Sequence, residues 1–271
     1  MVELDHKELL LEFIQKLENE EENVVLFLDE FPDVIQAIIK NDGPEKAIDT
    51  LTTLRSIRLN DKLKKFTLVF AGSIGLEHVI STLDRTKHVN DLKTIHVDPL
   101  TSPEATELIA QLTEGATMKI AEDEKIYLIN KTGHLLPYYI QLMIEKCDVI
   151  LRPEQRPGLT VEDIDLAYKL IIKEGRSFED WEHRLSKYLS SEDAGYCKEI
   201  LMRCAHSEVY PIVEAYDLSK RIIPNTHYKQ LIDDVLLKDG YLVEEGKGYR
   251  FLSPFLKEWW ANRHPKFEIE D

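Results

Sequence analysis

Two runs of consecutive apolar residues stand out from the helical patterns around them. The runs are Val24–Leu28, between Asn23 and Asp29, and Phe66–Ala71, which lies between Lys65 and Gly72 and contains one threonine. An unbroken apolar run of this length predicts a strand that is buried on both faces, as in a parallel sheet. Thr94–Val97 predicts a third, shorter strand. The pattern therefore predicts an α/β core within the first hundred residues.

Apolar residues at helical spacing dominate the rest of the chain. Around the strands they predict helices over His6–Glu18, Asp33–Lys40, Glu45–Arg58 and Leu76–Leu83. After the third strand they predict a helix that begins at Ser102–Pro103 and two more at about 123–130 and 136–149. The segment Arg152–Gly158, with two prolines and a glycine, is the clearest linker. Helices then follow from Thr160 and over 178–189.

The last eighty residues follow a different order of elements. The pattern predicts helices over 194–205, about 211–220 and 226–238, strands over 240–243 and 249–252, and a closing helix that contains Trp259 and Trp260. Three helices followed by a two-stranded ribbon is the order of a winged helix.

Composition narrows the possible functions. The chain has 271 residues, of which 43% are hydrophobic. Its formal charge is −16, and this negative charge argues against constitutive, nonspecific binding of nucleic acid. We expect a cytoplasmic protein without membrane contact, because the apolar runs are short and the N-terminus is acidic. Cys147, Cys197 and Cys204 have no paired spacing, so we expect them to stay reduced and to bind no metal.

The first apolar strand runs directly into Asp29 and Glu30. Ligands bind at the carboxyl ends of strands in α/β folds, so both acids are candidates for a site. In phosphoryl transfer, one such acid holds Mg²⁺ through a water while its neighbour orients or deprotonates the attacking water. The alternative is a pair of solvated acids at the start of a helix, where the helix dipole favours negative charge.

The phosphate-binding half of such a site is absent from these 271 residues. A phosphate loop requires G-x-x-x-x-G-K-[ST], in which backbone amides cradle phosphate and the Lys reaches its oxygens. Among the 11 glycines only Gly246 precedes a lysine, and Lys247 is followed by Gly248 in a predicted β-turn.

The order of the segments resembles a prokaryotic AAA+ or STAND-type P-loop ATPase of the archaeal ATPase group, related to origin-recognition ATPases. The resemblance rests on LFLDEFP (26–32), LRSIRL (54–59), FAGSIGLEHVI (70–80), DPLTSPEATELI (98–109) and KTGHLLPYYIQLM (131–143), followed by the winged-helix pattern. It implies an α/β plus α fold: an incomplete P-loop sheet core over 1–100, a helical lid over 101–150, a helical linker over 151–190 and a winged helix over 191–271.

The resemblance also implies roles for single residues. Asp29 becomes the Mg²⁺-associated acid and Glu30 the water-activating acid. Ser73 becomes the sensor-1 residue, which contacts the nucleophilic water or the γ-phosphate; the alternative for Ser73 is a cap of the following helix. The segment Gly133 to Pro137 corresponds to the lid motif near the base and sugar, although relatives usually have Gly-x-Pro and here three residues lie between.

Arg55, Arg58 and Arg85 are the basic residues nearest the nucleotide face that the resemblance implies. Each is either an arginine finger or a surface salt-bridge residue. The parent protein is expected to bind ATP and Mg²⁺ and to act as a nucleotide-dependent switch with slow hydrolysis. This chain alone is expected to hydrolyse little or no ATP, because it lacks the phosphate loop.

Without the strand that carries the phosphate loop, the sheet should have a gap. Either the remaining strands close up, or a second chain fills the gap, or the sequence is a truncated one. We expect truncation. Unpaired strand edges would also favour self-association.

The alternative function is a non-enzymatic module in which the winged helix binds DNA or docks on a protein. His227, Lys229 and Gln230 on the predicted recognition helix would read bases, while Lys247 and Arg250 on the wing would touch phosphate. Residues 191–271 contain 15 acidic and 11 basic residues, a net charge of 11 − 15 = −4. This acidity favours a protein partner over DNA.

Overall fold

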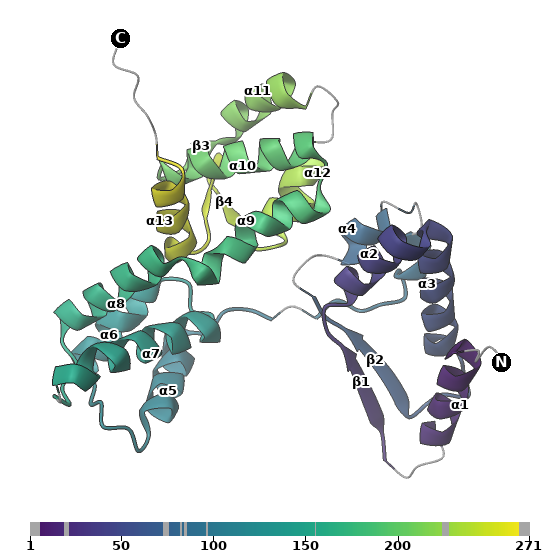
Figure 1. Ribbon diagram of the computed structural model, residues 1–271, viewed down its shortest axis with the longest axis horizontal. Coiled ribbons are helices and arrows are strands. Elements are labelled where there is room, and N and C mark those ends of the chain that lie inside the picture. The colour runs from purple at the N-terminus through teal and green to yellow at the C-terminus, as the bar shows by residue number, and fades with distance from the viewer. Residues whose placement is uncertain are drawn as a thin grey trace. The chain divides into compact units, whose positions relative to one another are not determined.

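The computed structural model describes residues 6–18, 22–72, 76–81, 83, 86–95, 97–154, 156–223 and 228–265. Its contacts divide the chain into two compact units, Met1–Ile95 and His96–Asp271, which we call unit 1 and unit 2 (Figure 1). Each unit is described by itself below.

Unit 1 is built on two parallel strands. β1 (Val24–Leu28) pairs with β2 (Phe66–Phe70) in a register that sets Val24 against Phe66 and Leu28 against Phe70. The parallel pairing that the apolar runs predict is confirmed. The helical elements of the unit are α1 (His6–Glu18), α2 (Phe31–Asp42), α3 (Pro44–Arg58), α4 (Leu76–Ser81) and the short 3₁₀ turn η1 (Thr86–His88).

The helices of unit 1 gather on one side of the sheet (Figure 1). The buried core on that side contains Ile14, Ile35, Leu51 and Ile80 from the four α-helices. On the other face of β1, Val25 is 48% exposed and Phe27 is 68% exposed. The prediction of a strand buried on both faces is therefore wrong for the described residues, because none of them covers this second face.

The third predicted strand, Thr94–Val97, is also wrong. Thr94, Ile95 and Val97 pair with no strand among the described residues, and His96 lies outside them. Ile95 is 73% exposed and Val97 is 88% exposed. An apolar run becomes a strand only when it pairs with a neighbour, and the described residues of this segment pair with neither open edge of the β1–β2 sheet.

Unit 2 consists mainly of helices. They are α5 (Ser102–Thr113), α6 (Glu122–Thr132), α7 (Pro137–Glu154), α8 (Val161–Glu174), α9 (Arg176–Tyr188), α10 (Ser191–Ala205), α11 (Ile212–Ile222), α12 (Tyr228–Leu231) and α13 (Pro254–Arg263). The predicted helix over 226–238 differs from the structure, since α12 passes into a π-helical turn, η2 (Ile232–Leu237). Among the described residues no helix is both long and apolar enough to span a membrane.

A small antiparallel sheet closes unit 2. Its strands are β3 (Tyr210–Pro211), β4 (Leu242–Glu245) and β5 (Gly248–Phe251), in the order β3-β5-β4. β4 and β5 form a hairpin whose register sets Leu242 against Phe251. The two predicted strands are therefore present with shifted ends, and β3 adds a third that the pattern did not indicate.

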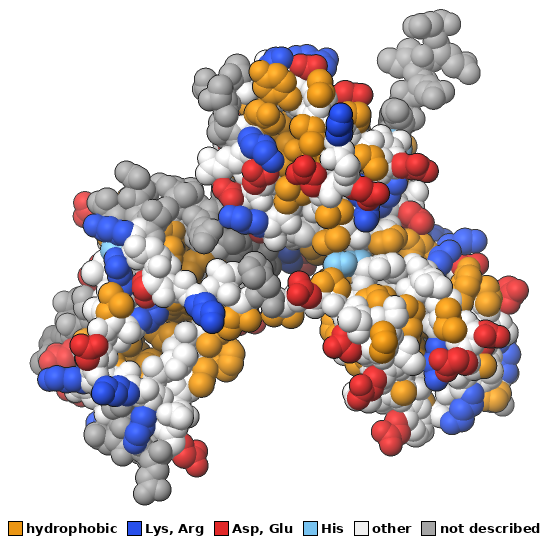
Figure 2. Space-filling model, turned by 180° about the vertical axis from the view of Figure 1, so that it is seen from behind, with side chains coloured by type: hydrophobic (Ala, Val, Ile, Leu, Met, Phe, Trp, Pro, Cys, Tyr) orange, Lys and Arg blue, Asp and Glu red, His pale blue; other side chains and the backbone are white. Residues whose placement is uncertain are grey.

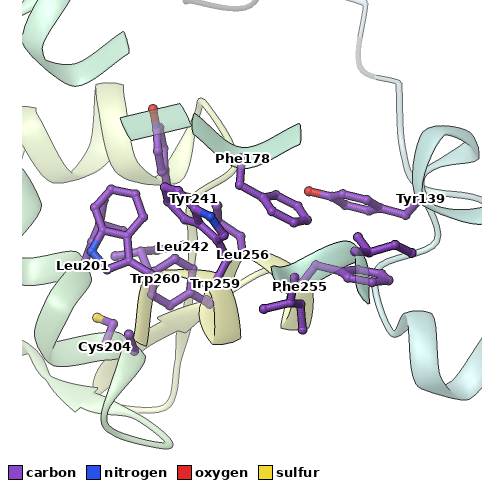
Figure 3. Close-up of a cluster of buried hydrophobic side chains, with 14 of the residues drawn as sticks. Tyr139, Phe178, Leu201, Cys204, Tyr241, Leu242, Phe255, Leu256, Trp259 and Trp260 are labelled. Atoms are coloured by element: carbon purple, nitrogen blue, oxygen red, sulfur yellow. The ribbon is translucent and has the colours of Figure 1, made fainter. Parts of the chain in front are cut away.

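One continuous hydrophobic core joins the helices of unit 2. Figure 3 shows its aromatic part, in which Phe255 of α13 lies beside Tyr139 of α7 and Phe178 of α9. The ring centroids of Phe255 and Tyr139 are 5.2 Å apart, and those of Phe255 and Tyr168 are 4.5 Å apart. The closing helix α13 thus packs directly against α7 and α9.

The Pro- and Gly-containing segment at Arg152–Gly158 is held by backbone hydrogen bonds. Lys119 N–H donates to Pro157 O at 2.7 Å, and Leu159 N–H donates to Lys119 O at 3.0 Å. The segment therefore connects α7 to α8 while bonded to the chain just before α6.

Candidate functional site

Asp29 and Glu30 form an exposed turn between β1 and α2. Glu30 has φ 50° and ψ 32°, and it is the one non-glycine residue with positive φ among those described. Its N–H donates to Asp29 Oδ1 at 2.9 Å. Backbone strain of this kind in a non-glycine residue is concentrated at functional sites. Both carboxylates lie at the carboxyl end of the parallel sheet, which is the edge that the sequence predicts.

The backbone after β2 is bonded to this turn. Ala71 N–H donates to Leu28 O and Phe31 N–H donates to Ala71 O, each at 3.0 Å. A Cβ on Gly72 would lie 2.5 Å from Pro32 Cδ, so a side chain at this position would force a shift. These contacts hold the ends of the two strands together. Ser73, the predicted sensor-1 residue, lies outside the described residues.

Arg55 and Arg58 both pair with an acid inside unit 1. Arg58 donates to the two carboxylate oxygens of Asp91 at 2.7 and 3.0 Å and to His88 O at 2.8 Å. Arg55 Nε lies 3.7 Å from Asp91 Oδ1. The hydrogen bonds from Arg58 hold the pKa of Asp91 below its ordinary value. The contacts favour the salt-bridge interpretation of both arginines. Arg85 is not among the described residues.

Gly133 and Pro137 lie in unit 2, at the end of α6 and the start of α7. Gly133 has φ 68°, and a Cβ added to it would lie 2.6 Å from Pro254 Cγ. Burial lowers the pKa of the adjacent His134. Pro254 begins α13, so the lid segment packs against the closing helix. No local pattern in the sequence predicts this contact.

Two of the five residues predicted for DNA contact form ion pairs with acidic neighbours. Lys229 Nζ lies 2.5 Å from Asp233 Oδ1, and Arg250 forms an ion pair with Glu245. Gln230 and Lys247 are exposed. His227 lies outside the described residues. Both paired cations have lost much of the free charge that phosphate binding requires.

Asp29 has the oxygen chemistry that Mg²⁺ prefers, and its exposure fits a metal held through a water. Mg²⁺ commonly takes only one or two carboxylates and completes its shell with waters and substrate phosphates. Within the described residues no group of three or more His, Cys, Asp or Glu residues is placed to hold a metal ion. The three cysteines are free and buried, and burial raises the pKa of Cys147 and Cys204 to about 12.

Comparison with known proteins identifies the fold. A Walker-type ATPase of Pyrococcus abyssi superposes with a TM-score of 0.60, over 96% of this chain and 69% of its own, at 16% identity. This chain has the fold of a Walker-type ATPase. No family model and no curated protein matches the sequence.

Two further solved structures are similar to this chain. The RuvB Holliday junction branch migration motor of Thermotoga maritima has a TM-score of 0.46 and 16% identity, over 98% of this chain and 76% of its own. The ORC2 protein of Aeropyrum pernix also has a TM-score of 0.46, with 14% identity over 98% of this chain and 72% of its own.

Proposed function

We propose that this chain is the portion of an AAA+ or STAND-type ATPase that contains the acidic half of the nucleotide site, and that the parent protein is a nucleotide-dependent switch. The observation that carries the proposal is the turn at Asp29 and Glu30. Two exposed carboxylates stand together at the carboxyl end of paired parallel strands, with Glu30 held in a left-handed conformation.

Each residue has a defined task in this proposal. Asp29 holds Mg²⁺ through a water, and Glu30 orients or deprotonates the water that attacks the γ-phosphate. Mg²⁺, when bound, neutralises charge on the phosphate oxygens. Ser73 contacts the attacking water or the γ-phosphate, and the segment Gly133 to Pro137 packs near the base and sugar.

The phosphate-binding half of the site is proposed to come from a strand and helix outside these 271 residues. Each strand of the two-stranded sheet has one unpaired edge in the described structure, and Val25 and Phe27 form an apolar patch on the uncovered face. An added strand would form hydrogen bonds with the unpaired backbone groups of one of these edges. The helix after that strand would cover the apolar patch of Val25 and Phe27. As it stands, the chain is proposed to hydrolyse little or no ATP.

The C-terminal elements are proposed to form a winged helix that docks on a protein. Support for the winged helix comes from the order α10, β3, α11, α12, β4 and β5. Support for a protein partner comes from the acid pairing of Lys229 and Arg250 and from exposed apolar side chains on α11, where Val213 is 68% exposed. Nucleotide state would be passed to this partner by lid movement.

Calorimetric titration with Mg-ATP tests the catalytic proposal. The 271-residue chain should show no submicromolar binding, because it has no backbone nest or lysine for the phosphates. Extending the chain with in-frame upstream sequence that encodes a G-x-x-x-x-G-K-[ST] loop should restore binding. In that extended chain, E30Q should lower the hydrolysis rate by about 10²-fold or more with ATP affinity retained.

The matched control is E45Q, an exposed acid at the start of α3, which should leave the rate unchanged. Submicromolar binding by the 271 residues alone would contradict the proposal. The absence of any phosphate loop in the upstream reading frame would contradict the proposed source of the missing half.

A further inference from the structure

Unit 2 contains a groove between α8 and α13. Its volume is about 460 Å³, within the range of small-ligand sites. It is lined by Lys169, Ile172 and Lys173 from α8 and by Glu258, Trp259, Asn262 and Arg263 from α13. Ile172 and Trp259 are buried and form the apolar floor, while the remaining side chains supply the polar rim.

The groove concentrates positive charge in an acidic protein. Lys169 and Lys173 are one helical turn apart, so they project from the same face of α8. Both are exposed, and neither forms a hydrogen bond or an ion pair with another described residue. Asp165, one turn before Lys169, is already bonded to Lys131 and Tyr127.

Three other lysines of unit 2 differ from this pair. Lys220, Lys229 and Lys238 each lie within 2.9 Å of an aspartate oxygen on their own element or the one beside it. Figure 2 shows the same mixing of charge on one face of the molecule, where acidic and basic side chains are interspersed. Lys169 and Lys173 are therefore better able to bind an external anion than these three paired lysines.

Two contacts shape the rest of the rim. Arg263 Nε donates to Glu182 Oε2 at 3.3 Å, and its guanidinium carbon lies 5.8 Å from the centre of the Trp259 ring. Glu258 accepts a hydrogen bond from the Tyr168 hydroxyl at 3.1 Å. The lining thus carries three cations and one carboxylate, a net charge of 3 − 1 = +2.

We propose that this groove binds a run of phosphate groups, either the backbone of a single-stranded nucleic acid or a free polyphosphate. Lys169 and Lys173 supply the ammonium groups that bind the phosphates, and Asn262 adds a neutral donor. Arg263 contributes less, because its guanidinium is already paired with Glu182. Trp259 is only 5% exposed and offers no open ring for base stacking. Recognition is therefore of the phosphates, independent of base sequence and weakened by salt. The site is independent of the function proposed for Asp29 and Glu30.

Fluorescence anisotropy of a labelled oligothymidylate, titrated with the full chain at about 50 mM salt, tests the proposal. The double variant K169E/K173E should weaken binding at least about tenfold and should reduce the salt dependence, because it removes two phosphate contacts. The variant E258Q should tighten binding by about threefold, because it removes the one carboxylate from the lining. Tryptophan fluorescence of each variant checks that unit 2 remains folded.

The matched control is K229E/K247E, which makes the same change in charge on the predicted recognition helix and wing. It should weaken binding less than about threefold. Displacement of the oligonucleotide by tripolyphosphate would support a free polyphosphate as ligand, and binding of the oligonucleotide alone would support nucleic acid. The proposal is overturned if K169E/K173E and K229E/K247E lose the same affinity for the oligonucleotide, or if neither phosphate probe binds. It is also overturned if a polyglutamate peptide displaces the oligonucleotide better than tripolyphosphate does.

Discussion

Three backbone positions hold the candidate segments of this protein in place. Glu30 adopts a left-handed conformation that costs a non-glycine residue about 1–2 kcal/mol. Gly72 allows the chain after β2 to approach Pro32, and Gly133 allows the end of α6 to approach Pro254. At both glycines the missing side chain leaves room for a contact with a segment that lies elsewhere in the chain.

Gly133→Ala should destabilise unit 2 by about 3 kcal/mol, because its positive φ and the contact with Pro254 both disfavour a Cβ. The measurement is urea unfolding followed by tryptophan fluorescence. Gly115→Ala is the control, since Gly115 also has a positive φ but a Cβ added there would meet no atom within 4 Å. It should cost only about 1 kcal/mol. Equal losses of unfolding free energy in the two variants would show that Pro254 does not constrain the chain at Gly133.

At the scale of elements, α8 is held at its start by a network around one buried acid. Asp163 accepts hydrogen bonds from Thr160 N–H at 2.9 Å and from the Arg156 guanidinium at 2.5 and 2.8 Å. The Thr160 hydroxyl in turn accepts from Asp163 N–H, which completes a capping box. The hydrogen bonds from Arg156 are the main reason that the pKa of Asp163 is lowered. The network fixes where α8 begins and thereby orients the face that carries Lys169 and Lys173.

Asp163→Asn should lower the free energy of unfolding by about 2 kcal/mol at pH 7, because the variant loses charge-assisted hydrogen bonds. A lowered carboxylate pKa contributes stability that is present above the ordinary value of 3.8 and is lost as the pH falls through the folded-state pKa. The difference between wild type and variant should therefore shrink below about pH 4. Denaturant unfolding at several pH values measures it.

Asp148→Asn is the control for this variant. Asp148 pairs with Arg152 on the exposed surface of α7, so its loss should cost less than about 0.5 kcal/mol at any pH. A difference between wild type and Asp163→Asn that does not change with pH would show that the ion pair does not stabilise the start of α8.

At the scale of the whole molecule, the two units have separate cores and different spectroscopic signals. The core of unit 2 extends from α5 to α13, whereas that of unit 1 contains residues such as Ile14, Ile35 and Leu51. Residues 1–95 contain neither tryptophan nor tyrosine, so all three tryptophans belong to unit 2. Tryptophan fluorescence therefore reports on unit 2 alone, while far-UV circular dichroism reports on both units.

Ile35→Ala should destabilise unit 1 by about 2–4 kcal/mol, because Ile35 is fully buried. Its unfolding, followed by circular dichroism, should gain a component at lower denaturant while the tryptophan transition stays in place. Ile171→Ala, a buried residue of α8, should have the converse effect and shift the tryptophan transition. Coincident shifts of both signals in either variant would contradict separate unfolding.

Sequence patterns predicted most elements because helix and strand periodicity reflect local burial. Val24–Leu28 and Phe66–Phe70 were recognisable as parallel strands, and Asp29 and Glu30 as the acids at their carboxyl end. The pattern failed at Thr94–Val97, which finds no partner strand among the described residues, and at Val25 and Phe27, which nothing described covers. An apolar run indicates that a segment is suited to strand pairing and burial. It does not indicate whether another segment lies beside it to pair with it or to cover it.

The sequence by itself determined the order of the elements, the acidic turn and the lack of a phosphate loop within these 271 residues, because these depend on residues adjacent in the chain. Only the tertiary structure revealed the pairing of Arg58 with Asp91, the contact of Gly133 with Pro254 and the groove lined by Lys169 and Lys173. Each of these joins segments far apart in the chain. Their contacts arise from packing in three dimensions, which no local periodicity encodes.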